Sequence, residues 1–293
     1  MQSLDTLVSQ LSLEEKVALC SGEDFWHTKS IPHVNIPSLM MCDGPHGLRK
    51  QPGDAQFLEM NDSEEAICFP TAATTACSFD VQLLKRLGQA LGEECQAEKV
   101  GLLLGPAINI KRSPLGGRNF EYFSEDPVLS GKMGAAYVNG IQTNGVSACP
   151  KHFACNNQED NRMGVNVRVS ERALREIYLR GFEIAVKKSR PVAMMSAYNL
   201  VNGIHAANSW ELCTAVAREE WGFEGVIMSD WNTTVPEDGS VPWQCIAAGN
   251  DIIMPGNKKD DENICKAYED GKLSEEMIRR SAGRIFQMLK KLG

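Results

Sequence analysis

The chain repeats one pattern along most of its length: a short apolar segment, bounded by glycine, proline or polar residues, followed by a longer amphipathic segment. Short apolar segments bounded in this way are typical of strands that are buried on both faces. Seven segments fit this description, at residues 34–47, 66–74, 100–110, 145–154, 191–203, 222–231 and 249–256. We predict a strand within each of them.

The segments between these strands predict helices. Leucines recur at helical spacing in residues 80–100, and apolar residues do the same in residues 170–189. Ser12 and Glu15 form a capping-box pattern at the start of a helix near the N-terminus. Residues 273–293 predict a final helix.

Strands that alternate with helices predict an α/β fold with a parallel sheet. Two architectures remain, a (β/α)8 TIM-type barrel, irregular or incomplete, and an open doubly wound sheet. The predicted strands end in polar residues, namely Asp43, Asn109, Lys151, His152, Tyr198 and Asp230. A barrel brings all such ends to one mouth, whereas an open sheet gathers only those near a switch point. The sequence also lacks a glycine-rich phosphate loop. We therefore favour a barrel formed by residues 1–293 as one domain, with residues 51–66 as a long loop at its mouth.

The composition limits the partners and the location that we expect. A formal net charge of -8 argues against nucleic acid or an anionic membrane as the main partner. No apolar run is long enough to span a membrane, and the N-terminus lacks the basic and apolar regions of a signal peptide. The 10 cysteines are scattered, with no Cys-x-x-Cys motif and no His/Cys cluster. We predict a cytoplasmic protein with free, buried thiols, without a metal and without another cofactor.

Asp230 is the strongest candidate for chemistry. A carboxylate at the end of an apolar strand is costly unless another group neutralises or uses it, and its ordinary role would be a helix cap or a buried ion pair. Here we expect Arg118, Lys151 and Arg162, together with the imidazole of His152, to face the same mouth. Such cations would lower the pKa of Asp230 and keep the carboxylate ionised. An ionised carboxylate suits nucleophilic attack, and the cations can donate hydrogen bonds to a polyhydroxylated ligand.

Three more residues have both a functional and a structural interpretation. Asp43 follows an apolar segment in a tight turn, where it could cap the turn or bind two sugar hydroxyls. Tyr198 could supply a hydrogen-bond donor and Trp231 an apolar face, although either residue could equally belong to the core.

Other polar residues are predicted to have structural roles. We expect His46 and His205 to be structural, and Glu159 and Asp160 to lie on a solvated loop. One different chemistry stays open, because a lysine at a strand end can form a Schiff base, and Lys151 would then be the nucleophile of a lyase or aldolase.

Several long blocks of the sequence resemble one known family. The blocks are "MCDGPHGLR", "LLGPAINIKRSPLGGRNFEYFSEDP", "PKHFACNNQEDNRMGVNVRVSERALREIYLRGFE", "SAYNLVNG" and "GFEGVIMSDW", and they occur in the order of that family. In these blocks the chain, from near residue 10 to its end, is similar to the N-terminal barrel domain of family 3 glycoside hydrolases, in the β-glucosidase-like branch.

The resemblance implies roles for individual residues. Asp230 corresponds to the family nucleophile of a retaining mechanism, in which the enzyme forms a covalent glycosyl intermediate. The residues that correspond to the family's innermost sugar subsite are Asp43, Arg118, Lys151, His152, Arg162 and Tyr198. The resemblance therefore implies hydrolysis of terminal non-reducing β-D-glucosyl residues, with a β-glucoside or a related sugar as the ligand.

The resemblance also implies a second carboxyl group, which acts as acid and base. In this branch it is a Glu on a following α/β sandwich domain, which we expect to be absent from this chain. A single-barrel branch that acts on N-acetylglucosaminides uses its own His and Asp, but here no His lies between His152 and His205. We thus expect a partner domain or chain of the sandwich type. The alternatives are an excised domain, one half of a split enzyme, or a sugar-binding barrel with little turnover.

Overall fold

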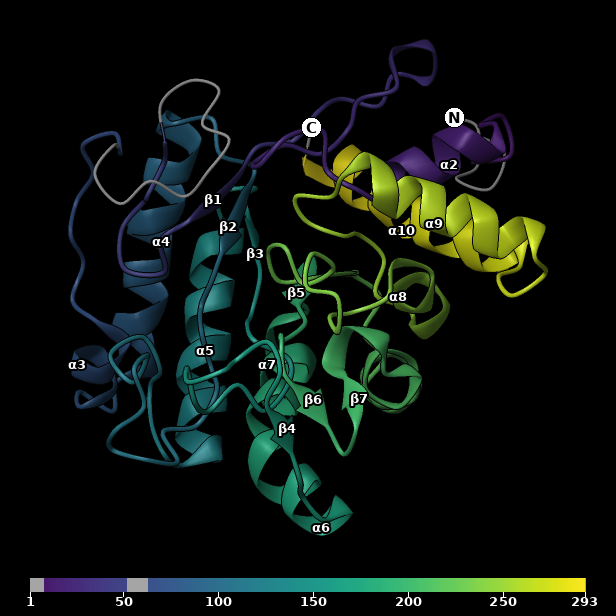
Figure 1. Ribbon diagram of the computed structural model, residues 1–293. Helices are drawn as coiled ribbons and strands as arrows, with labels where there is room; N and C mark the ends of the chain where they lie inside the picture. The colour runs from purple at the N-terminus through teal and green to yellow at the C-terminus, as the bar shows by residue number, and fades with distance from the viewer. Residues whose placement is uncertain (1–7, 52–62, 293) are drawn as a thin grey trace.

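A computed structural model describes residues 8–51 and 63–292 of the chain, so most of the loop predicted at 51–66 lies outside the described residues. The structure is of the mixed α/β type, with parallel strands between layers of helices (Figure 1). The strands are β1 (Met41–Asp43), β2 (Leu102–Leu104), β3 (Ser147–Ala148), β4 (Asn166–Val167), β5 (Ala193–Met195), β6 (Leu200–Val201), β7 (Ile204–His205) and β8 (Val226–Met228).

Parallel pairing occurs in three separate ladders, one of which joins β4 to β6. β1 pairs with β2 and β2 with β3, while β5 pairs with β8. Single parallel bridges extend these ladders, from Ala107 to Lys151, from Phe153 to Ser196 and from Met228 to Ile252. Among the described strands the pairings belong to separate sheets, and no single ladder closes on itself as an eight-stranded barrel would.

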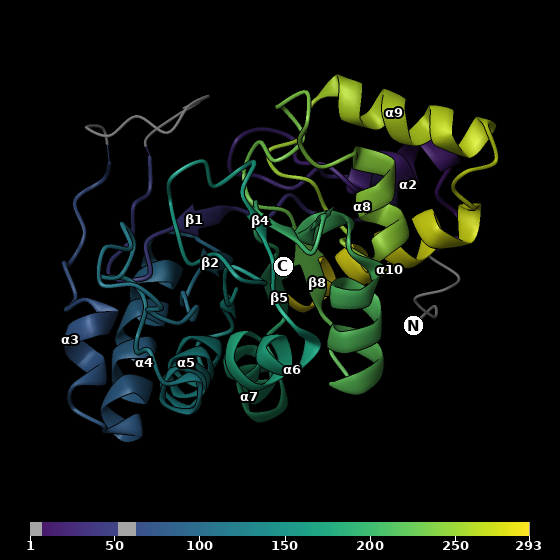
Figure 2. The ribbon, with the colours of Figure 1, turned by 60° about the horizontal axis from the view of Figure 1, so that its bottom comes forward.

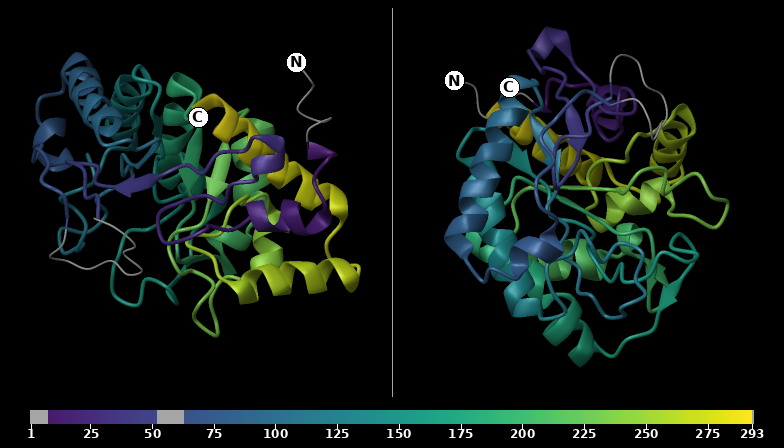
Figure 3. Two further views of the ribbon diagram at one scale, coloured as in Figure 1. Left: turned by 90° about the horizontal axis from the view of Figure 1, so that it is seen from above. Right: turned by 90° about the vertical axis from the view of Figure 1, so that its left-hand side faces the viewer.

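Helices cover the strands on two sides. The α-helices are α2 (Leu13–Leu19), α3 (Ala72–Ala76), α4 (Val81–Ala97), α5 (Pro127–Gln142), α6 (Glu171–Ala173), α7 (Arg180–Ser189), α8 (Pro242–Ala248), α9 (Lys258–Glu269) and α10 (Glu275–Leu292). Short 3-10 helices form η1 (Pro32–Val34) and η3 (Ala206–Asn208), and π-helical turns form η2 (Leu174–Tyr178) and η4 (Glu211–Glu220). Figure 2 shows the row α3, α4, α5 and α7 on one side of the strands and the group α2, α8, α9 and α10 on the other. The views of Figure 3 show the same two layers.

Side-chain alternation along the strands explains this layered arrangement. Leu102 and Leu104 of β2 belong to the hydrophobic cluster that includes residues of α2 and α10. Leu103 points the other way, into the cluster that includes residues of α4, α5 and α7. Successive side chains of a strand point to opposite faces, so a continuous apolar run is what a strand buried on both faces requires.

The helix predictions agree with the structure in position. Ser12 and Glu15 form the expected capping box at the start of α2. Asp80 caps α4, where its side chain accepts hydrogen bonds from the backbone of the first turn. Residues 170–189 form one helical stretch, but it is divided into α6, the π-helical η2 and α7.

Three of the strand predictions need correction. Residues 249–256 form no strand of their own and make only single bridges, at Ile252 and Ile253. The strand predicted at residues 66–74 is wrong, because residues 63–71 have no regular structure and Thr71 caps the helix α3. Ile67 in this segment is 61% exposed, and a buried strand would not leave it so. The segment 191–203 contains β5 as expected, but its second half forms β6, which pairs with β7 and with β4.

The cysteines match the expectation in part. All ten are free thiols, and seven of them are buried. Cys68 was expected inside a strand, but it is exposed because residues 66–74 do not form that strand. Across the residues that the structure describes, no helix combines the length and the apolar character that crossing a bilayer requires.

Candidate active site

The carboxyl ends of the parallel strands surround a cavity of about 410 Å³. Asp43 closes β1, Lys151 and His152 follow β3, Tyr198 follows β5, and Asp230 follows β8. All eight residues singled out from the sequence line this cavity, namely Asp43, Arg118, Lys151, His152, Arg162, Tyr198, Asp230 and Trp231. The fold therefore brings residues from across the sequence together at one mouth.

Asp230 lines this cavity, although its side chain is largely buried. The residue is 8% exposed, and its Oδ1 accepts a hydrogen bond from the backbone N–H of Trp231 at 2.7 Å. Its Oδ2 is buried and accepts no hydrogen bond within the described part of the chain, and Nε2 of His152 lies 3.8 Å from it. A buried carboxylate oxygen without a partner is costly, so its position calls for a ligand or a reaction.

The prediction that the surrounding cations lower the Asp230 pKa below its ordinary value is wrong. Arg118, Lys151 and Arg162 do act to lower the pKa, as does the hydrogen bond from Trp231, but burial has the larger effect and the net result is a raised pKa. Burial favours the neutral carboxyl because a low-dielectric site solvates charge poorly. The sequence pattern identified the cations but could not show how deeply the fold buries the carboxyl group.

Asp43 and Lys151 form a close ion pair. Nζ of Lys151 donates to Oδ1 of Asp43 at 2.7 Å, and the side chain of Lys151 is almost fully buried. Burial by itself would raise the pKa of Asp43, but the charge and hydrogen bond of Lys151 bring it below the ordinary value. Burial likewise acts to lower the pKa of Lys151, and the charges of Asp43 and Glu121 raise it overall. A Schiff-base lysine needs a lowered pKa, so this pairing argues against the lyase alternative.

The backbone fixes His152 in place. The side-chain amide of Asn109 accepts a hydrogen bond from the backbone N–H of His152 at 2.7 Å. The same amide donates a hydrogen bond to the carbonyl oxygen of His152 at 2.8 Å. The peptide bond between Lys151 and His152 is cis. Burial, and then the charge of Arg118, lower the pKa of His152 well below its ordinary value. The imidazole is therefore neutral at neutral pH and can donate or accept a hydrogen bond in the cavity.

Glu121 is a site residue that the sequence analysis missed. One guanidinium nitrogen of Arg118 lies 2.6 Å from Oε1 of Glu121, and both residues line the cavity. Burial raises the pKa of Glu121 against the opposing charges of Lys151 and Arg118. The signal in the sequence was the spacing of Arg118 and Glu121 within "GGRNFE", since residues three apart in a turn can form an ion pair.

Arg162 is held by two contacts. Its guanidinium pairs with Glu159 at 2.9 Å and lies 4.8 Å from the centre of the Tyr198 ring. The hydroxyl of Tyr198 donates to the carbonyl oxygen of Trp231 at 2.6 Å, and burial and the charge of Asp230 raise the Tyr198 pKa. The expectation of a solvated Glu159 is thus wrong, because the residue is partly buried and orients Arg162, whereas Asp160 is exposed as expected.

The two histidines expected to be structural make backbone contacts. Nε2 of His46 accepts a hydrogen bond from the N–H of Ala72 at the start of α3, and burial lowers the His46 pKa to about 4. The ring nitrogens of His205 lie 3.0 Å and 2.8 Å from the carbonyl oxygens of Tyr198 and Asp238.

An aromatic wall stands beside the polar groups. Phe25 and Trp26 line the cavity with Trp231, and the ring centres of Trp26 and Trp231 are 5.7 Å apart. The indole N–H of Trp231 donates to the carbonyl oxygen of Phe25 at 2.8 Å. The sequence analysis missed Phe25 and Trp26 because they lie before the first predicted strand. Polar groups around one aromatic face are the arrangement expected for a site that holds a ring with many hydroxyl groups.

Comparisons with known proteins identify the family to which the chain belongs. Residues 27–288 match the family described as "Glycosyl hydrolase family 3 N terminal domain". The chain is 51% identical over 284 residues to a thermostable beta-glucosidase B of Acetivibrio thermocellus. The matched residues make up 97% of this chain and 37% of that relative. It is 45% identical over 285 residues to an exo-alpha-(1->6)-L-arabinopyranosidase of Bifidobacterium longum, with the same coverage of 97% and 37%.

The chain is also similar to solved structures of beta-glucosidases. The beta-glucosidase 3B of Thermotoga neapolitana in complex with glucose superposes with a TM-score of 0.91 at 44% identity, covering 99% of this chain and 43% of that one. The beta-glucosidase of Kluyveromyces marxianus in complex with glucose has a TM-score of 0.91 at 38% identity, covering 99% and 34%. The chain spans little more than a third of the length of the curated relatives described here. By its match over residues 27–288, the chain belongs to glycosyl hydrolase family 3, as the N-terminal domain of that family.

Proposed function

We propose that this chain takes part in the hydrolysis of terminal non-reducing β-D-glucosyl residues by a retaining mechanism, with Asp230 as the nucleophile. The observation that carries the proposal is the carboxyl group of Asp230, which follows β8 and lines a cavity that is also lined with cations, and whose Oδ2 accepts no hydrogen bond from the described residues. The relatives named as beta-glucosidases support the choice of sugar.

The proposed chemistry begins with attack by Asp230. A carboxylate oxygen of Asp230 bonds to the anomeric carbon of the sugar as the bond from that carbon to the leaving oxygen breaks. A general acid gives its proton to the leaving oxygen. Water later attacks the same carbon, passes its proton to the deprotonated acid, and releases Asp230 as a carboxylate. Because burial raises the Asp230 pKa, the cations beside it are needed to keep enough of the carboxylate ionised.

The surrounding residues bind and orient the sugar in this proposal. Asp43 is ionised by its pair with Lys151, so it can accept hydrogen bonds from two hydroxyl groups while Lys151 donates to an adjacent oxygen. Arg118 and His152 line the same cavity, and Trp231 provides an apolar surface for the ring.

The general acid is proposed to come from outside these residues. Asp43 pairs with Lys151 and Glu121 with Arg118, so both carboxyl groups of the cavity other than Asp230 have binding partners. The relatives are much longer than this chain, and a Glu on a further α/β sandwich domain would complete the pair of carboxyl groups that retention needs.

We also infer that the separate sheets act as one irregular barrel, in a domain that spans residues 1–293. The support comes from the bridges between the ladders and from a further parallel bridge between Ser21 and Ile253, together with antiparallel bridges from Gly22 to Thr28 and from His27 to Met40. These pairings would continue the ladder from β8 back to β1.

A second candidate has support from one comparison. The relatives named as exo-alpha-(1->6)-L-arabinopyranosidases share 45% identity, so an α-L-arabinopyranoside is the alternative substrate. A sugar-binding domain without turnover is the other alternative, and it predicts binding without a covalent intermediate.

A fluorinated glucosyl fluoride tests the proposal on this chain as it stands. Fluoride leaves without a proton, so 2-deoxy-2-fluoro-β-D-glucosyl fluoride requires only the nucleophile and the sugar site. We expect mass spectrometry to find one added sugar on the peptide that contains Asp230, and none on an Asp230→Asn variant. A label on another carboxylate would refute the role of Asp230, and calorimetric binding of glucose without any label would support the binding alternative.

A further inference from the structure

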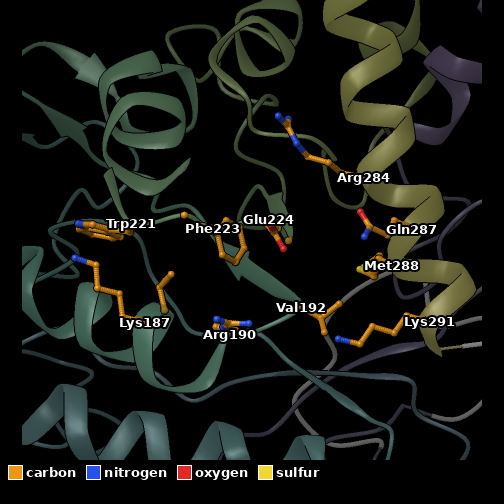
Figure 4. A pocket seen from close by; sticks show the side chains of 14 residues that line it. Lys187, Arg190, Val192, Trp221, Phe223, Glu224, Arg284, Gln287, Met288 and Lys291 are labelled. Atoms are coloured by element: carbon orange, nitrogen blue, oxygen red, sulfur yellow. The ribbon is translucent and has the colours of Figure 1, made fainter. Parts of the chain in front are cut away.

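A second cavity lies at the opposite end of the strands from the candidate active site. It is larger, at about 530 Å³, and it lies where β5 and β8 begin, between the ends of α7 and η4 and the last turns of α10. Figure 4 shows the side chains that line it. We call it the rear groove and define it by Lys187, Arg190, Trp221, Phe223, Arg284 and Lys291. Neither the family match nor the proposed reaction gives this groove a role.

The groove concentrates positive charge in an acidic protein. Four of its lining residues are basic and only one, Glu224, is acidic, although the whole chain has a net charge of -8. Lys187 pairs with Glu183, and Arg284 pairs with Asp251, which also binds Arg218.

Arg190 and Lys291 are the cations available to a ligand. Neither forms an ion pair within the residues that the structure describes. In Figure 4 their side chains lie on the two sides of Val192, with Arg284 across the cavity. Two unpaired cations on one rim make a site where an anion would be held from both sides.

The backbone of Arg190 adds an independent observation. Arg190 caps the C-terminus of α7 with φ 43° and ψ 61°, in the left-handed region. Glycine or asparagine takes this position at low cost, whereas an arginine there is strained. Strained residues of this kind concentrate at functional sites, and here the strained residue carries one of the two available cations.

The floor of the groove is apolar. Val192, Phe223 and Met288 line it and are 9%, 3% and 2% exposed. Trp221 lines the same cavity and is partly exposed, with Lys187 beside it in Figure 4. Trp221 is the most exposed of these four apolar side chains, so an apolar, preferably flat, part of a ligand would lie against Trp221 next to the charged part of the groove.

We propose that the rear groove binds a small organic anion, with a phosphate or carboxylate held by Arg190 and Lys291 and an aromatic or other flat apolar part against Trp221. Its volume lies within the range of roughly 300–1,000 Å³ that is usual for small-molecule sites.

Isothermal titration calorimetry with phenyl phosphate tests this proposal. We expect phenyl phosphate to bind at least about tenfold more tightly than inorganic phosphate or phenol, because each of these supplies only half of the contacts. The double variant Arg190→Gly and Lys291→Gln removes both cations, and the glycine suits the left-handed backbone, so the fold is retained. It should weaken phenyl phosphate binding about tenfold or more.

Two control variants show whether the loss of phenyl phosphate affinity arises in the rear groove. The double variant Lys188→Gln and Lys290→Gln changes the net charge equally on neighbouring exposed residues that do not line the groove, and it should leave the affinity unchanged. The variant Arg118→Gln in the other cavity should also leave it unchanged. The proposal is overturned if phenyl phosphate fails to bind at millimolar concentration, if inorganic phosphate binds as tightly, or if either control weakens binding as much as the groove variant.

Discussion

At the scale of single residues, Asp230 combines two opposing requirements. The proposed reaction needs an ionised carboxylate, but burial raises the Asp230 pKa and the neighbouring cations only partly offset this. A buried group with a shifted pKa is typical of catalytic positions, where the free energy of unfolding is often lower than it would be without that group.

This conflict predicts a pH-dependent gain in stability for Asp230→Asn. In the folded protein Asp230 keeps its proton to a higher pH than in the unfolded chain, so its contribution to the free energy of unfolding falls as the pH rises through the ordinary aspartate range to the raised value. The amide should stabilise the fold by on the order of 1 kcal/mol at neutral pH, with the gain disappearing at low pH. Urea denaturation at several pH values measures this. The exposed Asp160→Asn is the matched control, and an equal gain at every pH would contradict the explanation.

The same pKa predicts the pH dependence of covalent labelling. The rate constant of labelling by the fluorinated glucosyl fluoride should rise with pH as Asp230 ionises, with a midpoint above that of an ordinary aspartate. Arg162 lowers the Asp230 pKa, so Arg162→Gln should move the midpoint to higher pH, whereas the exposed Arg168→Gln should not. A midpoint that moves downward in Arg162→Gln would be inconsistent with the electrostatic account.

Glu121 is predicted to be a positioning residue. Its ion pair at 2.6 Å holds Arg118, so Glu121→Gln should weaken glucose binding roughly tenfold through a mobile Arg118. Calorimetry with glucose measures this, and the exposed Glu125→Gln is the control. Unchanged glucose affinity in Glu121→Gln would remove the positioning role.

At the scale of elements, close helix packing supports the strands that carry the site. α4 and α5 approach closely at Gly88, where a Cβ atom would collide with the carbonyl oxygen of Tyr137. In α10, by contrast, the nearest atom to a Cβ at Gly283 would be 4.0 Å away, on Val8.

This difference predicts that replacing each of these two glycines by alanine changes the free energy of unfolding in opposite directions. Alanine is a better helix former than glycine, so Gly283→Ala should stabilise the protein by about 0.5–1 kcal/mol. Gly88→Ala gains the same propensity but forces the two helices apart, and it should destabilise the protein by about 1–3 kcal/mol. Thermal and urea denaturation of the two variants provide the test, and a stabilised Gly88→Ala would show that α4 and α5 can separate without cost.

At the scale of the whole molecule, the sequence predicted the composition of the site better than the shape of the fold. Asp43, Lys151, Tyr198 and Asp230 could be predicted because each follows a strand, and parallel strands bring their carboxyl ends to one side. Phe25 and Trp26 could not, because long-range packing alone places them beside Trp231.

The fold was predictable only in its coarse features. Alternating apolar and amphipathic segments predicted parallel strands and helices, but they did not predict how the strands divide into separate sheets. Residues 66–74 resembled a strand in composition, yet Pro70 and the cap at Thr71 lead into a helix. The direction of the Asp230 pKa depends on burial, which is a property of the folded molecule and not of the residues around it in the sequence.

If the general acid comes from outside this chain, as proposed, the chain alone should prefer some substrates over others. Substrates with leaving groups that need no proton should form the covalent intermediate on this chain, whereas alkyl β-glucosides should react more slowly by about 10² to 10⁴, the usual contribution of a general acid. Parallel assays with the glucosyl fluoride and methyl β-D-glucoside measure the ratio. Comparable rates for both would place the general acid within this chain.

The proposed role of Asp230 requires that one of its carboxylate oxygens bonds to the anomeric carbon. A crystal structure of the chain after reaction with 2-deoxy-2-fluoro-β-D-glucosyl fluoride tests for this bond. We expect continuous electron density from a carboxylate oxygen of Asp230 to an anomeric carbon of inverted configuration, with sugar hydroxyls bonded to Asp43 and Lys151. A sugar that lies in the cavity without a covalent bond, or that is bonded to Asp43 or Glu121 instead, would contradict it.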